Sequence, residues 1–174
     1  MPGLATQRLT LTALTADQLR QALSHPERLG ASLNCLLAEG CFSDASRRAI
    51  YVKLDKMDQA DEPLHSWFTY WLIVLREEKV AAGLVGYKGA PDDNGEVEIG
   101  YGISPAYQGK GYMTEAVHGL VEWAFRQPGC GSVCAETLRT NIASQRVLQK
   151  NGFILTRETP VELYWRIIKP PVER

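Results

Sequence analysis

Residues 96–125 read EVEIGYGISPAYQGKGYMTEAVHGLVEWAF, and the spacing of their apolar side chains changes part-way along. Up to Ile103, apolar residues alternate with acidic or small ones, which is the period of a β-strand whose two faces differ. Pro105 cannot donate a backbone hydrogen bond to a neighbouring strand, so the strand ends before it. From Met113 onward, apolar residues recur at helical spacing. The sequence therefore predicts a strand and an amphipathic helix joined by a short segment.

That joining segment, Gln108–Gly111, carries two glycines around a lysine where the first helical turn must form. The first backbone N–H groups of a helix have no partner within it and carry partial positive charge, and glycines let an anion approach them closely. The segment is a candidate phosphate site; alternatively, the glycines only turn the chain into the helix. Neither GxxxxGK[ST] nor a GxGxxG after the strand is present, which argues against the common nucleotide-binding motifs.

Two motifs resemble those of a known family. Gln108–Met113 resembles the Q/R-x-x-G-x-G/A acyl-CoA signature of the GNAT superfamily of N-acetyltransferases, with methionine in place of the usual glycine or alanine at the last position. Asn141–Phe153 resembles the family's second motif, which begins with Asn and ends in K-x-G-F. Three further stretches are similar to the branch that includes the ribosomal-protein acetyltransferases RimJ and RimL: Gln7–Leu11, Glu98–Tyr101 and Gly109–Ala116.

The resemblance covers most of the chain and implies a reaction. The expected reaction transfers the acetyl group of acetyl-CoA to a primary amine, by direct attack in a ternary complex and without a metal ion. The acceptor is a protein N-terminus or a small amine, and a homodimer is a family-level expectation. The alternative is a non-catalytic acyl-CoA-binding regulatory or sensor module, because Leu148 stands where many members carry a tyrosine acid.

The resemblance also implies where the cofactor lies. Acyl-CoA is expected where two adjacent strands separate, with its pyrophosphate on backbone N–H groups at the helix N-terminus and its pantetheine arm paired with the preceding strand. Lys110 is alternatively a solvated side chain, and Asn141 alternatively only caps the helix that follows it. The residues implied to bind the cofactor are Gly102, Ile103, Ser104, Gln108, Gly109, Lys110, Gly111, Tyr112, Met113, Thr114 and Asn141.

Amide formation requires a neutral amine, so a base is expected near the thioester. Glu98 is the first candidate, because it lies on the strand that leads into the loop and matches the glutamate that some family members use. Glu136, on the next predicted strand, is the second candidate, and either could act through water. The alternative for both is a surface or sheet-edge carboxylate. A backbone N–H near Ile103, freed by a strand irregularity, is the expected donor to the oxyanion.

The departing thiolate benefits from a proton donor, since a thiol has a pKa near ~8.5. The tyrosine that serves many family members is absent at Leu148, and Ser144 matches the serine of the RimL-like branch. Ser144 is therefore the candidate acid, alone or through water. The alternative is that its hydroxyl only caps the start of a helix.

Composition limits the other possibilities. The chain has 174 residues, 45% hydrophobic and 22% charged, and its formal net charge of -1 argues against a general nucleic-acid binder. No signal peptide is evident, and the longest apolar run, Tyr70–Leu75, is far shorter than the ~20 residues of a membrane helix. We expect a cytoplasmic protein whose four cysteines are free thiols, with no metal-type spacing among them.

The remaining sequence predicts elements around this centre. An edge strand is expected at 9–13, and Thr15 begins a capping box for a helix that ends at His25. Further helices are expected at 31–39, 44–57 and from Asn141 to Asn151, and further strands at 67–75, 80–87, 132–138, 153–157 and 162–168. The predicted fold is α/β (α+β): a mixed, mostly antiparallel sheet of about six to seven strands with helices on both faces, in a single domain spanning 1–174.

Overall fold

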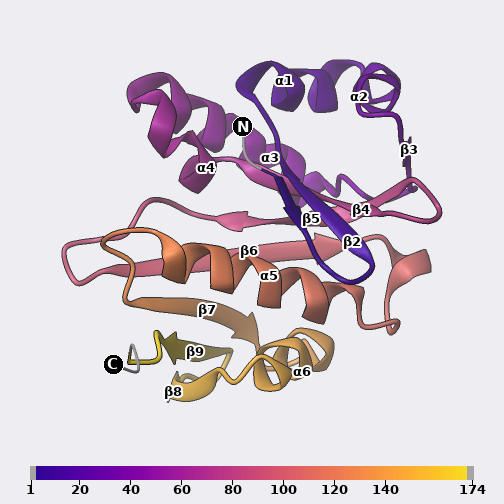
Figure 1. Cartoon of the computed structure of the whole chain (residues 1–174). Coiled ribbons are helices and arrows are strands. Elements are labelled where there is room, and N and C mark those ends of the chain that lie inside the picture. Colours follow the sequence, from indigo (N-terminus) through magenta and orange to yellow (C-terminus); the bar gives the residue numbers. More distant parts are fainter. Residues whose placement is uncertain (1–2, 172–174) are drawn as a thin grey trace.

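The computed structural model describes residues 3–171, and the strand predicted at 96–103 lies in the middle of its sheet (Figure 1). The strands are β1 (Gly3–Ala5), β2 (Leu9–Ala13), β3 (Leu36–Leu37), β4 (Tyr70–Leu75), β5 (Val80–Tyr87), β6 (Glu96–Ile103), β7 (Ser132–Leu138), β8 (Ile154–Glu158) and β9 (Glu162–Ile168). The helices are α1 (Ala16–Ser24), α2 (Pro26–Ser32), α3 (Asp44–Gln59), α4 (His65–Phe68), α5 (Tyr112–Arg126) and α6 (Ile142–Lys150).

The sheet is mixed and mostly antiparallel, as predicted. Its order is β1-β2-β4-β5-β6-β7-β9-β8, with the short β3 beside β5. Only β6 with β7 and β3 with β5 run parallel among the described strands. The crossover from β6 to β7 is made by α5, because parallel neighbours need a long connection. The described chain has nine strands rather than six or seven, since β1 and β3 are too short to produce a periodic pattern.

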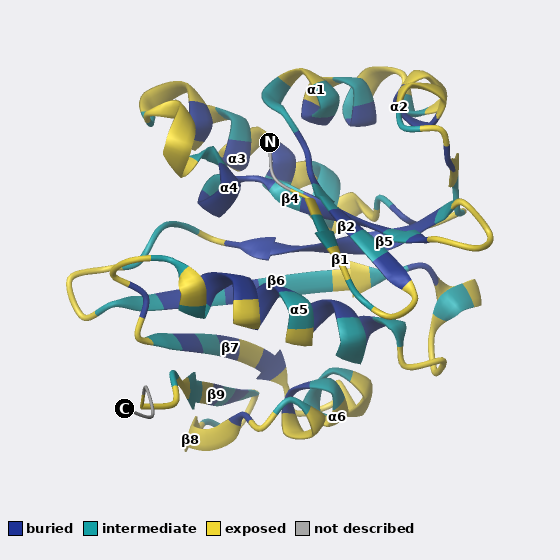
Figure 2. Cartoon of the chain, viewed as in Figure 1, coloured by how far each residue is buried: buried dark blue, intermediate teal, exposed yellow. Residues whose placement is uncertain are grey.

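Helices cover both faces of the sheet, as predicted, and each face has its own apolar core (Figure 2). On one face, α5 buries Ala116, Val117 and Leu120. On the other, α1, α2 and α3 bury apolar side chains against Leu72 and Leu84 of the central strands. The N-terminal helices therefore depend on the sheet for a core.

The aromatic residues near Trp67 belong to the core, but not to a strand that begins there. The predicted strand 67–75 starts only at Tyr70, and Trp67 lies in the one-turn helix α4. Its ring centroid is 4.6 Å from that of Trp123 on α5, and the two ring planes are tilted by 58°. The unbroken apolar run reflects burial in two successive elements, which periodicity alone cannot distinguish from one buried strand.

Two other local predictions were wrong. The helix predicted at 31–39 ends instead at Ser32, because Asn34 adopts a positive φ of 51° and Leu36–Leu37 pairs with β5. The strand at 9–13 is not an edge, because β1 covers it. The capping box at Thr15 and the left-handed Gly152 after α6 are both confirmed. No helix in the described part of the chain is long and apolar enough to cross a membrane.

Gly83 marks the closest approach of β5 to β6. A Cβ at this position would lie 2.3 Å from the carbonyl oxygen of Gly102 and 2.8 Å from the Cα of Ile103. Both atoms belong to backbone, so neither can move without shifting β6. Gly83 is therefore required for the position of the strand that leads to the predicted site.

We predict that Gly83→Ala lowers the free energy of unfolding by about 2 kcal/mol or more, because the added methyl overlaps backbone that cannot yield. Gly100→Ala is the matched control, since a Cβ at Gly100 on the neighbouring strand meets nothing within 4 Å. Urea titrations of both variants measure the difference. Equal stability of the two variants would contradict the close packing at Gly83.

Candidate active site

The start of α5 presents a row of unpaired backbone N–H groups. Gly109 and Gly111 have positive φ values of 74° and 81°, and Gly111 is the N-cap of the helix. The first helical hydrogen bond runs from the N–H of Glu115 to the carbonyl of Gly111, at 3.1 Å. Within residues 3–171, the N–H groups from Gly109 to Thr114 have no hydrogen-bond partner. The segment therefore has the donors and the positive helix end that an anion requires.

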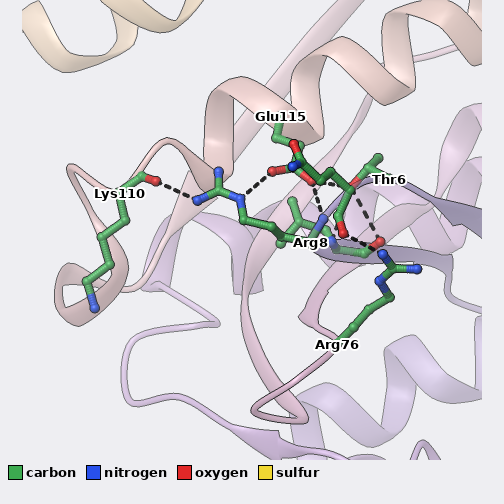
Figure 3. Close-up of polar contacts among 7 residues, drawn as sticks. Thr6, Arg8, Arg76, Lys110 and Glu115 are labelled. Carbon is green, nitrogen blue, oxygen red and sulfur yellow. Dashed lines mark hydrogen bonds and ion pairs between the residues drawn. The ribbon is translucent and has the colours of Figure 1, made fainter.

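The turn between β1 and β2 holds this helix end in place (Figure 3). Glu115 accepts hydrogen bonds from the hydroxyl of Thr6 at 2.6 Å and from the backbone N–H of Arg8 at 2.7 Å. The Nε of Arg8 also pairs with Glu115 at 2.7 Å, and its Nη1 donates to the carbonyl of Lys110 at 3.0 Å. Burial raises the pKa of Glu115, but the hydrogen bonds from Thr6 and Arg8 outweigh it and leave that pKa lowered. Arg8 therefore connects the loop to the sheet.

Strands β6 and β7 separate beside this helix end. They pair only at Glu96–Glu98 with Ser132–Cys134, after which β7 continues along β9. The carbonyl of Glu98 and the N–H of Ser104 bond to the β5 side, at 2.9 and 2.8 Å. Because bonding alternates along an antiparallel pair, Tyr101 and Ile103 direct their backbone groups to the open side. The backbone N–H of Ile103 is therefore free because β6 and β7 separate. The expected strand irregularity is absent here, since the register of β5 with β6 is continuous.

A cavity of about 360 Å³ lies between the open edge of β6 and the first turns of α5 and α6. It contains no acidic lining residue among the described residues. Of the residues predicted to bind the cofactor, those that line it are Gly102, Ile103, Gln108, Gly109, Gly111, Tyr112, Met113, Thr114 and Asn141.

Three predicted residues are arranged differently from the expectation. Ser104 is buried and does not line the cavity, because its hydroxyl donates to the carbonyl of Glu39 at 2.6 Å. The side chain of Lys110 is exposed and also lies outside the lining, with its ammonium 5.1 Å from the ring centroid of Tyr107. The N–H of Gln108 bonds to the carbonyl of Pro105 at 3.3 Å, so its backbone is not a free donor. Its side-chain amide donates to the carbonyl of Ile103 at 3.4 Å.

Ser144 lines the same cavity and is hydrogen-bonded to Tyr101, to which the sequence had assigned no chemical role. Its hydroxyl lies 2.8 Å from the phenol oxygen of Tyr101. Burial raises the pKa of Tyr101 to about 12, although the bond to Ser144 opposes the shift. Leu148, where the family tyrosine was expected, is fully buried. Asn141 caps α6 by accepting from the N–H of Ser144 at 3.1 Å, and it also lines the cavity.

A second cavity, of about 410 Å³, lies on the side of β6 that faces α3. It shares Tyr101, Gly102 and Ile103 with the first cavity. A Cβ at Gly100 or Gly102 would meet nothing within 4 Å, so these glycines leave the wall of the second cavity open. The two cavities therefore meet at the C-terminal end of β6.

The two predicted bases lie beside the point where β6 and β7 part. Glu98 forms an ion pair with Lys88, and both Glu98 and Glu136 line a groove next to the second cavity. Burial, a hydrogen bond with Glu162 and the charges of Glu162 and Glu98 raise the pKa of Glu136. Neither carboxylate lines the first or the second cavity. No group of three or more metal-ligating side chains occurs among the described residues.

The chain is similar to known proteins in both sequence and fold. A family model described as acetyltransferase (GNAT) domain matches residues 8–154, so the chain belongs to the GNAT acetyltransferase family. An uncharacterised N-acetyltransferase, YjdG of Bacillus subtilis (strain 168), is 34% identical over 98 residues, which are 56% of this chain. The aligned part spans 58% of that relative, less than two thirds of its length.

Solved structures share the fold at low sequence identity. The ribosomal-protein-S5-alanine acetyltransferase of Vibrio fischeri superposes with a TM-score of 0.68 and 16% identity, over 100% of both chains. RimL, a ribosomal L7/L12 alpha-N-protein acetyltransferase solved in complex with coenzyme A, has a TM-score of 0.67 and 16% identity. That match covers 96% of this chain and 98% of RimL.

Proposed function

We propose that the protein is an acetyl-CoA-dependent N-acetyltransferase that transfers the acetyl group directly to a primary amine. The observation that carries the proposal is the meeting of two cavities at Tyr101–Ile103, one beside free helix amides and one on the opposite side of β6. A thioester entering from the first cavity and an amine from the second would meet at this strand. Membership of the GNAT family supports the same reaction.

In this proposal the N–H groups of Gly109–Thr114 bind the diphosphate of acetyl-CoA. Their partial positive charge and the absence of other partners suit a diphosphate. Pantetheine pairs with the open backbone of Tyr101 and with the carbonyl of Ile103, in place of a strand neighbour, and leaves the N–H of Ile103 free. Arg8 supports the loop through the carbonyl of Lys110 and adds positive charge near it.

We predict that Gly109→Ala weakens acetyl-CoA binding by about tenfold or more, because loss of the positive φ redirects the amides by which the anion is held. Gly129→Ala is the matched control: Gly129 has a φ of 82°, a Cβ there also meets nothing within 4 Å, and it lies in the loop after α5. Both variants lose similar stability through backbone strain. Calorimetric titration with acetyl-CoA should separate them, and equal affinity in the two would contradict the amide site.

We propose that Glu136, with Glu98 beside it, removes the proton from the attacking amine, directly or through water. As the amine nitrogen bonds to the thioester carbon, its proton passes to the carboxylate, and the C–S bond then breaks. The raised pKa of Glu136 makes it a stronger base than an ordinary carboxylate. Glu98 is already paired with Lys88. The N–H of Ile103 is the proposed donor to the oxyanion.

Glu136→Gln should lower kcat/KM at neutral pH by about 100-fold for an alkyl amine with a pKa near ~10.4, and less for an α-amine with a pKa near ~8. Glu98→Gln should have a smaller effect. Glu122→Gln, an exposed glutamate on α5, serves as the control for loss of one negative charge. The measurement is the rate of thiol release from acetyl-CoA. If neither variant differs from the control, the carboxylates are not the base.

We propose that Tyr101 stabilises the departing thiolate and that Ser144 positions the phenol of Tyr101. With a pKa of about 12, the phenol keeps its proton at neutral pH and donates a hydrogen bond, whereas complete transfer to a thiolate of pKa ~8.5 is unfavourable. The hydroxyl of Ser144, 2.8 Å away, holds the phenol in position. Tyr101 thus supplies, from β6, the group that is missing at Leu148, and this weakens the non-catalytic alternative.

Tyr101→Phe should lower kcat by about 10- to 100-fold, the value of one hydrogen bond to a charged group, while KM for acetyl-CoA stays near the original value. Ser144→Ala should cause a smaller loss, because it only orients the phenol. Steady-state kinetics with acetyl-CoA and a saturating amine measure both effects. An unchanged kcat in Tyr101→Phe would remove Tyr101 from the mechanism.

The acceptor is proposed as a protein N-terminus or a small amine. Two structural neighbours are named for the acetylation of ribosomal proteins, which supports the first option without excluding the second. We also propose that the chain is a single domain spanning 1–174, because one sheet runs through the described residues from β1 to β8. Activity against a panel of N-terminal peptides and small amines would distinguish the two acceptor classes.

A further inference from the structure

The second cavity has an unusual distribution of charge. Lys53 and Lys56 of α3 and Lys88 after β5 all line it, and no aspartate or glutamate of the described chain does. Lys88 forms an ion pair with Glu98, which lies outside the cavity. Lys53 and Lys56 have no carboxylate partner among residues 3–171. The cavity proposed for the acceptor therefore carries positive charge.

Lys53 is buried in this wall, with 7% of its surface exposed. Its ammonium donates to the carbonyl of Tyr87 at 2.7 Å and to that of Thr69 at 3.4 Å, and it lies 4.4 Å from the ring centroid of Tyr70. All of these partners are neutral. These contacts hold α3 against the sheet but do not neutralise the charge of Lys53. Burying an ammonium without an opposite charge is costly.

The environment of Lys53 would favour an anion bound beside it. Burial, with the charges of Lys56 and Lys88, lowers the pKa of Lys53 to about 7. A carboxylate bound beside it would favour the charged form and reverse part of that shift. Two of the three ammonium protons already serve carbonyl groups, and Lys56 uses one on the carbonyl of Lys88 at 2.7 Å. The donors that remain suit a singly charged carboxylate better than a phosphate dianion.

We infer that the acceptor is a primary amine that also carries a carboxylate, which binds to Lys53 and Lys56 in the cavity between α3 and β6. This inference rests on the proposed function and names its acceptor class. The open wall at Gly100 and Gly102 gives the amine a route to the thioester while the carboxylate stays at the lysines. A free amino acid and a peptide with an acidic residue near its N-terminus are two sources of this chemistry.

The lysines would also assist the reaction itself. Nearby positive charges disfavour a bound ammonium, so they lower the pKa of the acceptor and increase its neutral fraction. The same charges that select the carboxylate therefore prepare the amine for attack. An acceptor without a carboxylate would experience the repulsion and gain no ion pair.

The test compares acceptors that differ in this charge, with kcat/KM expressed per neutral amine because the carboxylate also raises the pKa of the nearby amine. Each pair consists of a carboxylate and its amide: L-serine with L-serinamide, β-alanine with β-alaninamide, and the peptide amides Ser-Asp-Ala-Ala and Ser-Asn-Ala-Ala. O-phosphoethanolamine is added as the phosphate probe. We expect kcat/KM to favour the carboxylate member of at least one pair by about tenfold, in line with a charge-assisted hydrogen bond. The pair that shows the preference identifies the source.

Variants of the two lysines then test whether these side chains cause the preference for the carboxylate member. Lys56→Gln, at an exposed position, should reduce the preference several-fold, mainly through a lower kcat/KM for the carboxylate member. Lys53→Met should abolish it, and its thermal midpoint reports any loss of folding. Arg48→Gln is the matched control, because Arg48 is exposed on the same helix and does not line the cavity.

The outcomes separate this inference from the proposed function. Acetylation of amines with no preference for any carboxylate member overturns the inference and leaves the acetyltransferase intact. The same holds if Lys56→Gln and Arg48→Gln have equal effects, or if O-phosphoethanolamine is preferred over every carboxylate. Transfer to no amine of the panel, with acetyl-CoA bound, overturns the proposed function and the inference together.

Discussion

The structure depends on the place where β6 loses its neighbour. The two parallel strands share only Glu96–Glu98 and Ser132–Cys134, because β7 then follows β9. Beyond that point β6 is held from one side by β5, at a spacing that only a glycine at position 83 permits. The other side has backbone groups without a strand partner and a cavity on each face. A polar backbone edge next to a cavity is a candidate binding surface, because a ligand that pairs with it would satisfy its open backbone groups.

The second requirement is that the end of α5 stays free while the loop before it stays ordered. Hydrogen bonds and an ion pair fix the residues around these amides and leave the amides themselves free. Glu115 is tied to Thr6 and Arg8, and Arg8 reaches back to the carbonyl of Lys110. The loop is thus fixed through its carbonyl and side-chain contacts. This is why β1 and β2, remote in sequence, matter to a site built from residues 101–144.

Charge is separated along the face of the sheet that carries α3. Lysines line the cavity on one side, and Glu98 and Glu136 line the groove on the other. The ion pair of Lys88 with Glu98 forms the boundary. An acceptor at this boundary would meet positive charge for recognition and negative charge for proton removal. Burial, together with like charges nearby, lowers the pKa of Lys53 and raises that of Glu136.

The sequence alone determined the strand at 96–103, the glycine loop, the helix after it and the capped helix from Asn141, because each has a local period or a local cap. Those features also predicted most residues that line the first cavity. Tertiary structure decided the rest: that Ser104 is turned away toward Glu39, that Tyr101 reaches Ser144, and that Lys53 from a remote helix faces β6. These contacts join residues 43 to 65 positions apart or elements remote in sequence, and no local pattern encodes them. Periodicity reports which side of a strand is buried, whereas packing between distant segments sets what that side touches.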